Sequence, residues 1–253
     1  MAAVAGSILY HRCERACFGR TLTVDLKTAL IVGTGSGLSA SLARLFARNG
    51  LQVAMASRNP DNLARLAEET AGVTFACEAT EPEEVAALFD VVIATQGVPD
   101  IVVYNASARA RGPVTELDPE EVARAIAVSG YGGFLVAQQA ARHMVQRGSG
   151  AILLTGASAS VKGYPNSSAF AMGKFALRGL AQSLARELSP KGVHVAHFVI
   201  DGGIRSTVRT ESTDNPDSLL DPDAIAQTYW NVANQPRSAW TWEVELRPWV
   251  EKF

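Results

Sequence analysis

The sequence lacks the features that mark secreted, membrane-spanning or nucleic-acid-binding proteins. It has three cysteines in 253 residues, too few for a disulfide framework, and no apolar run close to the ~20 residues that cross a bilayer. Its 23 basic and 25 acidic residues leave a formal charge of −2, so no positive excess points to nucleic acid or anionic lipid. These absences predict a reduced, cytoplasmic protein that binds a small molecule and has no nucleic-acid or membrane partner.

Metal-binding and targeting signals are equally weak. Cys13 and Cys17 lie four residues apart, but no second cysteine pair or histidine partner follows at the spacing of zinc ligands, so no metal site is predicted. The apolar stretch at the start of residues 1–25 is too short for a secretory signal. We expect a poorly ordered N-terminal extension here, with an organelle-type presequence as the alternative.

A large hydrophobic share, 47% of the residues, allows one sizeable core, and no linker or repeat divides residues 26–253. Short apolar runs alternate with amphipathic stretches of helical length, which is typical of a parallel sheet with helices on both faces. The strands expected are Thr28–Val32, Gln52–Ala56, Val73–Cys77, Ile101–Tyr104, Gly150–Thr155, His194–Ile200 and Thr241–Leu246. The sequence therefore predicts one α/β domain, a doubly wound parallel sheet of about seven strands in a three-layer α/β/α sandwich.

Capping residues, prolines and glycines predict where the helices begin and end. The helices expected are Leu38–Asn49, Pro60–Thr70, Pro82–Ala94, one long helix from Pro119, one that follows Ser167 and ends before Pro190, and a short one from Pro222. The stretch Arg205–Leu220 is long, irregular and rich in Thr, Ser, Asn, Asp and Pro. Such loops in compact domains are usually functional, so we expect a substrate loop that covers the pocket as a lid.

A glycine-rich turn follows the first expected strand. Gly33, Gly35, Ser36, Gly37 and Leu38 stand between this strand and its helix, where backbone amides and the helix dipole can hold a pyrophosphate. A glycine-rich turn alone is often a simple tight turn, but this position favours dinucleotide binding in a Rossmann-type domain.

The end of the second strand distinguishes the two nicotinamide dinucleotides. NAD-binding proteins usually have an acid here that accepts hydrogen bonds from the ribose hydroxyls. This sequence has Ser57 and Arg58 instead, and a guanidinium suits a 2′-phosphate by charge and by bidentate geometry. We therefore predict NADP rather than NAD, with a solvated Arg58 and a ribose contact from Asp61 as the alternative.

Further segments appear in the order found in one known family. The spacing of Gly33 and Gly37, with Ser39 in place of a third glycine, resembles the cofactor loop of the short-chain dehydrogenase/reductase family. We expect the Ser39 side chain to loosen the packing of the first helix against the strand. The resemblance continues over nearly all of residues 28–253 and implies cofactor contacts from Glu78, Asn105, Ala106, Ser107, Gly202, Ile204, Ser206 and Lys174.

The resemblance also implies a catalytic centre, and this sequence departs from it. In the family a tyrosine acts as general acid or base, and a lysine four residues later holds the nicotinamide ribose and lowers the tyrosine pKa. Here Phe170 stands in the place of the tyrosine, and Lys174 is retained. The family serine aligns with Ala157, with Ser158 beside it, and the family asparagine aligns with Ser129.

Other groups are candidates for the missing acid. Tyr164 precedes the lysine helix and could reach the rim of the pocket, although an aromatic here often packs at a subunit interface or covers the substrate. Ser158 could hydrogen-bond the substrate oxygen, and a water held by Lys174 and Ser129 is a further alternative. Because general acid catalysis is typically worth about 10² to 10⁴ in rate, its loss slows hydride transfer without forbidding it.

The residues and the resemblance together predict an NADP-dependent oxidoreductase. It would transfer a hydride to or from a small carbonyl or alcohol, or a conjugated alkene, in an active site without the usual tyrosine. The alternative is a catalytically impaired NADP-binding protein with a sensor or partner-binding role, and non-redox chemistry in the same pocket is a third reading. The resemblance implies a homodimer or homotetramer, and the sequence leaves the substrate unassigned.

Overall fold

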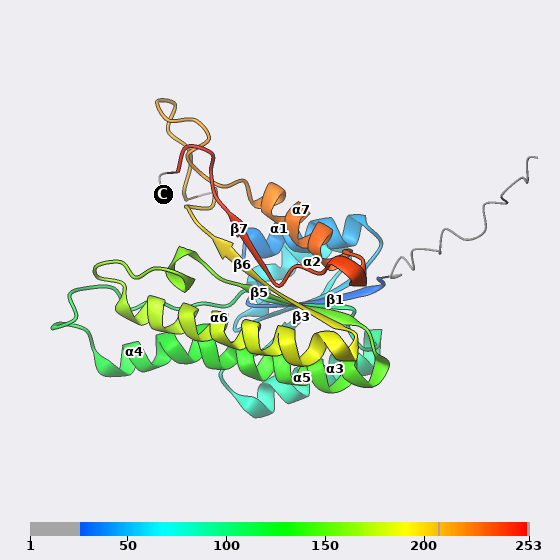
Figure 1. Cartoon of the computed structure of the whole chain (residues 1–253). Coiled ribbons are helices and arrows are strands. Elements are labelled where there is room, and N and C mark those ends of the chain that lie inside the picture. The colour runs from blue at the N-terminus through cyan, green and yellow to red at the C-terminus, as the bar shows by residue number, and fades with distance from the viewer. Residues whose placement is uncertain (1–25, 207, 252–253) are drawn as a thin grey trace, which may run out of the picture.

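The computed structural model describes residues 26–206 and 208–251, which fold around one sheet (Figure 1). The sheet has seven strands in the order β3-β2-β1-β4-β5-β6-β7, and every pair is parallel. The strands are β1 (Thr28–Val32), β2 (Gln52–Ser57), β3 (Val73–Ala76), β4 (Ile101–Tyr104), β5 (Gly150–Thr155), β6 (Val193–Ile200) and β7 (Glu243–Leu246). The predicted fold class is confirmed. The expected extension 1–25, with Cys13 and Cys17, lies outside the described residues.

Helices cover both faces of the sheet and form two apolar cores. The α-helices are α1 (Leu38–Arg48), α2 (Ala64–Thr70), α3 (Pro82–Gln96), α4 (Pro119–Ile126), α5 (Gly132–Arg147), α6 (Ser168–Leu188) and α7 (Pro222–Ala233). Figure 1 shows α1, α2 and α7 on one face and α3, α5 and α6 on the other. Because both faces are covered, the central strands β1 and β4 are buried at every position, as their uninterrupted apolar sequences require.

The expected long helix from Pro119 is interrupted by one turn of π-helix, η2 (Ala127–Tyr131), between α4 and α5. The buried Tyr104 at the end of β4 lies under this turn, and its hydroxyl donates a hydrogen bond to the carbonyl of Val128. A Cβ at Gly132 or Gly133 would overlap the hydroxyl of Tyr104 or the side chain of Leu177. The long helix expected from Pro119 is therefore present over residues 119–147, with a π-helical turn at the point where this tyrosine packs.

The stretch after β6 forms an irregular loop that projects from the carboxyl end of that strand (Figure 1). Its base is held by a bridge between Ile204 and Leu220 and by an ion pair of 2.7 Å between Arg205 and Asp221. The loop also accepts a hydrogen bond of 3.3 Å from the indole of Trp249 to Asp217. Because all the strands are parallel, this loop and the glycine turn leave the sheet at the same edge.

Two further findings concern the described part of the chain. None of its helices combines the length and the apolar character needed to cross a membrane. Between residues 26 and 251, leaving out 207, no group of three or more His, Cys, Asp or Glu side chains is arranged to hold a metal ion.

Candidate active site

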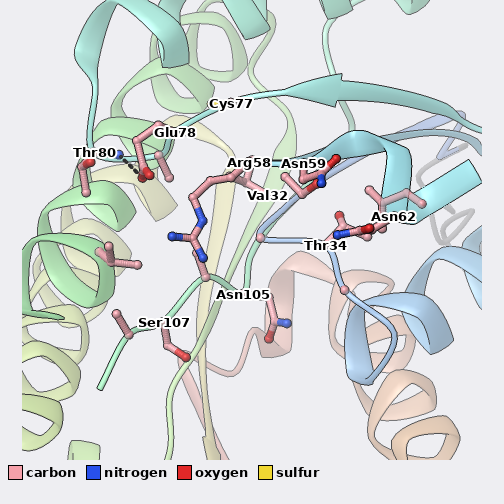
Figure 2. Close-up of a pocket in the computed structure, with 18 of the residues that line it drawn as sticks. Val32, Thr34, Arg58, Asn59, Asn62, Cys77, Glu78, Thr80, Asn105 and Ser107 are labelled. Atoms are coloured by element: carbon pink, nitrogen blue, oxygen red, sulfur yellow. Dashed lines mark hydrogen bonds between the residues drawn. The ribbon is translucent and has the colours of Figure 1, made fainter. Parts of the chain in front are cut away.

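A cavity of about 1080 Å³ opens at the carboxyl ends of the first four strands (Figure 2). The cavity lies beside β1, which has β2 as its neighbour on one side and β4 on the other, so the strand order reverses here. Doubly wound sheets bind their ligands at such a point. The predicted site residues that line it are Gly33, Gly35, Ser36, Ser57, Arg58, Glu78, Asn105, Ala106 and Ser107. The structure thus brings together the residues expected around one half of a dinucleotide.

The glycine turn is fixed to its neighbours by its backbone. The amides of Gly33 and Thr34 both donate to the carbonyl of Ala56, at 3.0 and 2.9 Å, which ties the turn to β2. Gly33 has a φ of 84° and packs so closely on Ala106 that a side chain would overlap it. Gly37 and the buried Leu38 form the start of α1 and do not line the cavity. Gly35 faces open space, as close approach of a pyrophosphate requires.

Ser39 strengthens the turn, contrary to the expectation that it would loosen it. Its side chain is 1% exposed, and its hydroxyl donates to the carbonyl of Gly33 at 3.1 Å. The same hydroxyl accepts a bond of 2.6 Å from the side-chain amide of Asn105. Because both polar groups are satisfied, the serine links the turn to the end of β4.

The far end of the cavity has the features of a site for a phosphorylated ribose. Figure 2 shows Arg58 reaching into the space between Glu78 and Asn105. Among the described residues, no ion pair includes Arg58. The hydroxyl of Ser57 is buried without a hydrogen-bond partner, so a ligand oxygen here would satisfy it. Asp61 does not line the cavity, which leaves the ribose contact considered for it without support.

Several cavity residues were not anticipated from the sequence. They are Val32, Thr34, Asn59, Asn62, Leu63, Cys77, Ala79, Thr80, Glu81, Ala108, Arg109, Arg124 and Val128. Asn59 carried a signal, because an asparagine before a proline predicts a cap, and its side chain accepts from the amide of Asp61 at 3.2 Å. Burial first, and then Glu84 and Glu78, raise the pKa of the Cys77 thiol to about 11, which disfavours the reactive thiolate.

Phe170 and Lys174 lie one turn apart on α6 and are both buried, at 7% and 3% exposure. The ammonium of Lys174 donates to the carbonyl of Thr155 at 2.7 Å and lies 5.8 Å from the centroid of the Phe170 ring. Burial, reinforced by the charge of Arg109, lowers the pKa of Lys174 to about 7. Among the described residues, the ammonium of the lysine is therefore held by a neutral backbone group and not by a carboxylate.

Arg109 connects this pair to the cavity. It lines the cavity, and its guanidinium carbon lies 4.0 Å from the centroid of the Phe170 ring, in a cation–π contact. Partial burial first, and then the charges of Arg111 and Arg209, lower the pKa of Arg109. No sequence motif marked this residue.

The other expected catalytic residues are spread around this centre. The hydroxyl of Ser129 is buried in the π-helical turn, where the amide of Ala108 donates to it at 3.3 Å. Ser158 opens the short helix η3 (Ser158–Ser160) after β5 and is half-buried. The side chain of Tyr164 is 44% exposed, and its ring lies 5.9 Å from the ammonium of Lys162. The structure therefore places Tyr164 at the surface, as the covering or interface role would require.

The residues expected after β6 do not line the cavity. Gly202 packs against Pro248 and Leu220 with a φ of 149°. Ile204 bridges to the end of the substrate loop. The hydroxyl of Ser206 accepts from the amide of Arg209 at 3.1 Å and so shapes that loop.

The parallel sheet, the glycine turn and the cavity beside it define a dinucleotide-binding α/β protein. Residues 27–217 match the model of the short chain dehydrogenase family. The chain belongs to this family, a class of NAD(P)-dependent oxidoreductases, and the predicted family is confirmed.

Similar proteins support the assignment. The chain is 30% identical over 177 residues to D-threitol dehydrogenase of Mycolicibacterium smegmatis, which covers 68% of each chain. A short-chain dehydrogenase from Rhodopseudomonas palustris superposes with a TM-score of 0.76 and 34% identity, over 88% of this chain and 99% of that one. A metagenomic short-chain oxidoreductase solved in complex with NADP has a TM-score of 0.76 and 26% identity, over 88% and 97%.

Proposed function

We propose that this protein is an NADP-dependent oxidoreductase that reduces a small carbonyl compound, or oxidises the corresponding alcohol, without a catalytic tyrosine. A conjugated alkene is an alternative acceptor of the same hydride. The observation that carries the proposal is the continuity of the site. The cavity runs from the glycine turn to Arg109, and Arg109 contacts the ring that stands one turn before Lys174.

Each region of the site has a distinct task in this proposal. Gly35 and Ser36 approach the pyrophosphate, and Arg58 binds the 2′-phosphate. Lys174 orients the nicotinamide ribose, and the bound cofactor supplies the hydride. Since Phe170 has no proton to give, the proton passes from Lys174 or from a water beside it. The lowered pKa of Lys174 suits that task, because an acid works best when its pKa is near the operating pH.

Stopped-flow fluorescence tests the reaction directly. Bound NADPH is mixed with a panel of small ketones, enals and quinones, and loss of nicotinamide fluorescence reports hydride transfer in a single turnover. We expect slow but saturable loss with at least one acceptor class. Tight NADPH binding with no hydride loss to any of them would contradict the redox proposal.

The second candidate is a cofactor-binding protein with a sensor or partner role. It is favoured by one observation, the cation–π contact that fills the space over Phe170 with the guanidinium of Arg109. The same stopped-flow experiment separates the two, because a sensor binds NADPH and transfers no hydride.

The preference for NADP gives a separate prediction. Arg58→Ala is expected to weaken NADPH binding about 10-fold to 100-fold and to leave NADH binding within about twofold, because charge-assisted hydrogen bonds to phosphate are worth ~1.5–3 kcal/mol. Fluorescence titration of each reduced cofactor measures both constants. Arg48→Ala is the matched control, since Arg48 is an exposed arginine at the end of α1, away from the cavity. Equal losses of affinity for NADPH and NADH would show that Arg58 does not bind the 2′-phosphate.

We further propose a homo-oligomer. Tyr131, Phe134, Met172 and Phe175 are exposed on the neighbouring elements η2, α5 and α6, and the rings of Tyr131 and Phe134 stack at 6.2 Å. An apolar surface of this kind is typical of a protein–protein interface. Light scattering after size-exclusion chromatography should give the mass of two or four chains, and the mass of one chain would overturn the proposal.

A further inference from the structure

Arg109 lines one end of the cavity, and cations from three separate segments, Arg109 included, act on one another there. Arg109 and Arg111 follow β4, Lys174 belongs to α6, and Arg209 belongs to the loop after β6. The guanidinium of Arg109 and the ammonium of Lys174 lie 4.0 and 5.8 Å from the same Phe170 ring centroid. Arg209 packs beside Gly203, with a guanidinium nitrogen 3.1 Å from where a Cβ on Gly203 would stand, and its charge acts on Arg109.

These charges are close enough to act on one another. The charges of Arg111 and Arg209, after partial burial, lower the pKa of Arg109, and the charge of Arg109 in turn acts on Lys174. Like charges held together cost free energy unless an anion lies between them. An anionic ligand bound beside Arg109 would relieve this repulsion.

No carboxylate in the described part of the chain forms an ion pair with the three arginines. Across residues 26–206 and 208–251, none of the ion pairs includes Arg109, Arg111 or Arg209. Cations that stand nearby in the sequence are paired, as Arg205 is with Asp221 and Lys162 is with Asp201. Arg58 and Arg124 also line the cavity without an ion pair among the described residues, so all three arginines that line it lack a protein carboxylate.

The phosphates of a bound cofactor belong to the other end. The glycine turn and Arg58 line the part of the cavity formed by β1, β2 and β3. Arg109 lines the same cavity but contacts α6, where the proposed function places the reacting atoms. An anionic group bound at Arg109 would therefore belong to the substrate.

We infer that the substrate is an anionic carbonyl or alcohol compound whose carboxylate binds Arg109, with Arg111 and Arg209 adding to the attraction. The inference rests on the proposed function, because it deepens the use of the same site. A planar guanidinium donates two parallel hydrogen bonds to a carboxylate, and this bidentate geometry would orient the carbonyl beside Lys174. The loop that carries Arg209 would then contribute to substrate binding by charge.

Pairs of probes that differ only in charge test the inference. Calorimetry measures the binding of 4-formylbenzoate and the nearly isosteric 4-formylbenzamide to the complex with NADP⁺, and acetoacetate and acetoacetamide form a second pair. We expect the carboxylate of at least one pair to bind tenfold or more tightly than its amide. Arg109→Gln should abolish this preference, and the control Arg48→Gln should retain it.

Three results would overturn the inference, and each leaves the proposed function testable by itself. One is the absence of a carboxylate preference in both pairs while NADP⁺ still binds. Another is a preference that survives Arg109→Gln. The third is a tenfold loss of NADP⁺ affinity in Arg109→Gln, which would assign this arginine to the cofactor. Failure of the proposed function appears differently, as a lack of NADPH binding or of hydride transfer to any neutral acceptor.

Discussion

Phe170→Tyr is expected to raise NADPH-dependent reduction of a carbonyl probe at least tenfold in single-turnover rate. The ring stands one turn before Lys174, whose ammonium lies 5.8 Å from the ring centroid, so a hydroxyl on this ring gains a nearby positive charge. That charge favours the phenolate and lowers the pKa of the new phenol. A positioned acid is typically worth about 10² to 10⁴ in rate, and we expect the lower part of this range because Ala157 and Ser129 still depart from the family pattern.

Two further variants sharpen this result. Ala157→Ser, added to Phe170→Tyr, restores a hydroxyl at the family position and should raise the rate further. Phe175→Tyr is the matched control, because Phe175 lies on the same helix but is 46% exposed, and it should leave the rate unchanged. If Phe170→Tyr binds NADPH normally and gains no rate, the site is not arranged for hydride transfer and the sensor reading is favoured.

The sheet could be predicted from the sequence because its signals are local. The strands β1, β4 and β5 have the predicted bounds, because each contains a short apolar run that stands out from its neighbours. The glycine turn was also recognisable, since its position between a strand and a helix gives the motif its meaning. By contrast, β7 begins at Glu243 and not at Thr241. The alternating pattern that predicted this strand already starts at Trp240 and Trp242, before the first residue that pairs with β6.

The structure differs from the expectations based on the sequence where residues far apart in the chain come into contact. The π-helical turn depends on Tyr104, which comes from another strand and bonds to Val128. The neighbouring glycines can be seen in the sequence, but the sequence does not show that the side chain of Tyr104 occupies the space beside them. Ser39 could be judged only as an extra side chain, because its partner Asn105 is 66 residues away.

Arg109 was missed for the same reason, and it changes the reading of the site. Its role comes from a contact between the loop after β4 and the helix α6, and no spacing in the sequence announces it. The sequence could show that the phenol is absent, but only the structure shows which cation stands over the ring. The candidate site is therefore predictable around the cofactor and unpredictable around the substrate.

Lys174→Met is expected to stabilise the fold at low pH while weakening the cofactor complex. Burial lowers the pKa of Lys174 to about 7 in the folded protein, whereas in the unfolded chain it returns to the ordinary lysine value of 10.5. Between these two pH values the unfolded chain binds more protons than the folded protein, so the free energy of unfolding rises with pH from about 7 to 10.5. Below pH 7 the lysine is charged in both states, and the full free-energy cost of burying the charge is present. Removing the amine removes that cost, although it leaves the carbonyl of Thr155 without its donor.

Urea denaturation of the two proteins at pH 6 and pH 9 measures this effect. The variant should exceed the wild type in free energy of unfolding by ~2 kcal/mol at pH 6, and the difference should shrink or reverse at pH 9. Lys191→Met is the control, because Lys191 is exposed and pairs only with Glu187 on the surface, so its effect should not vary between these pH values. NADPH binding to Lys174→Met should weaken tenfold or more. A variant that is less stable than the wild type by the same amount at both pH values would show that the pKa of Lys174 is not lowered, and the lysine would then be too weak an acid to donate the proton at neutral pH.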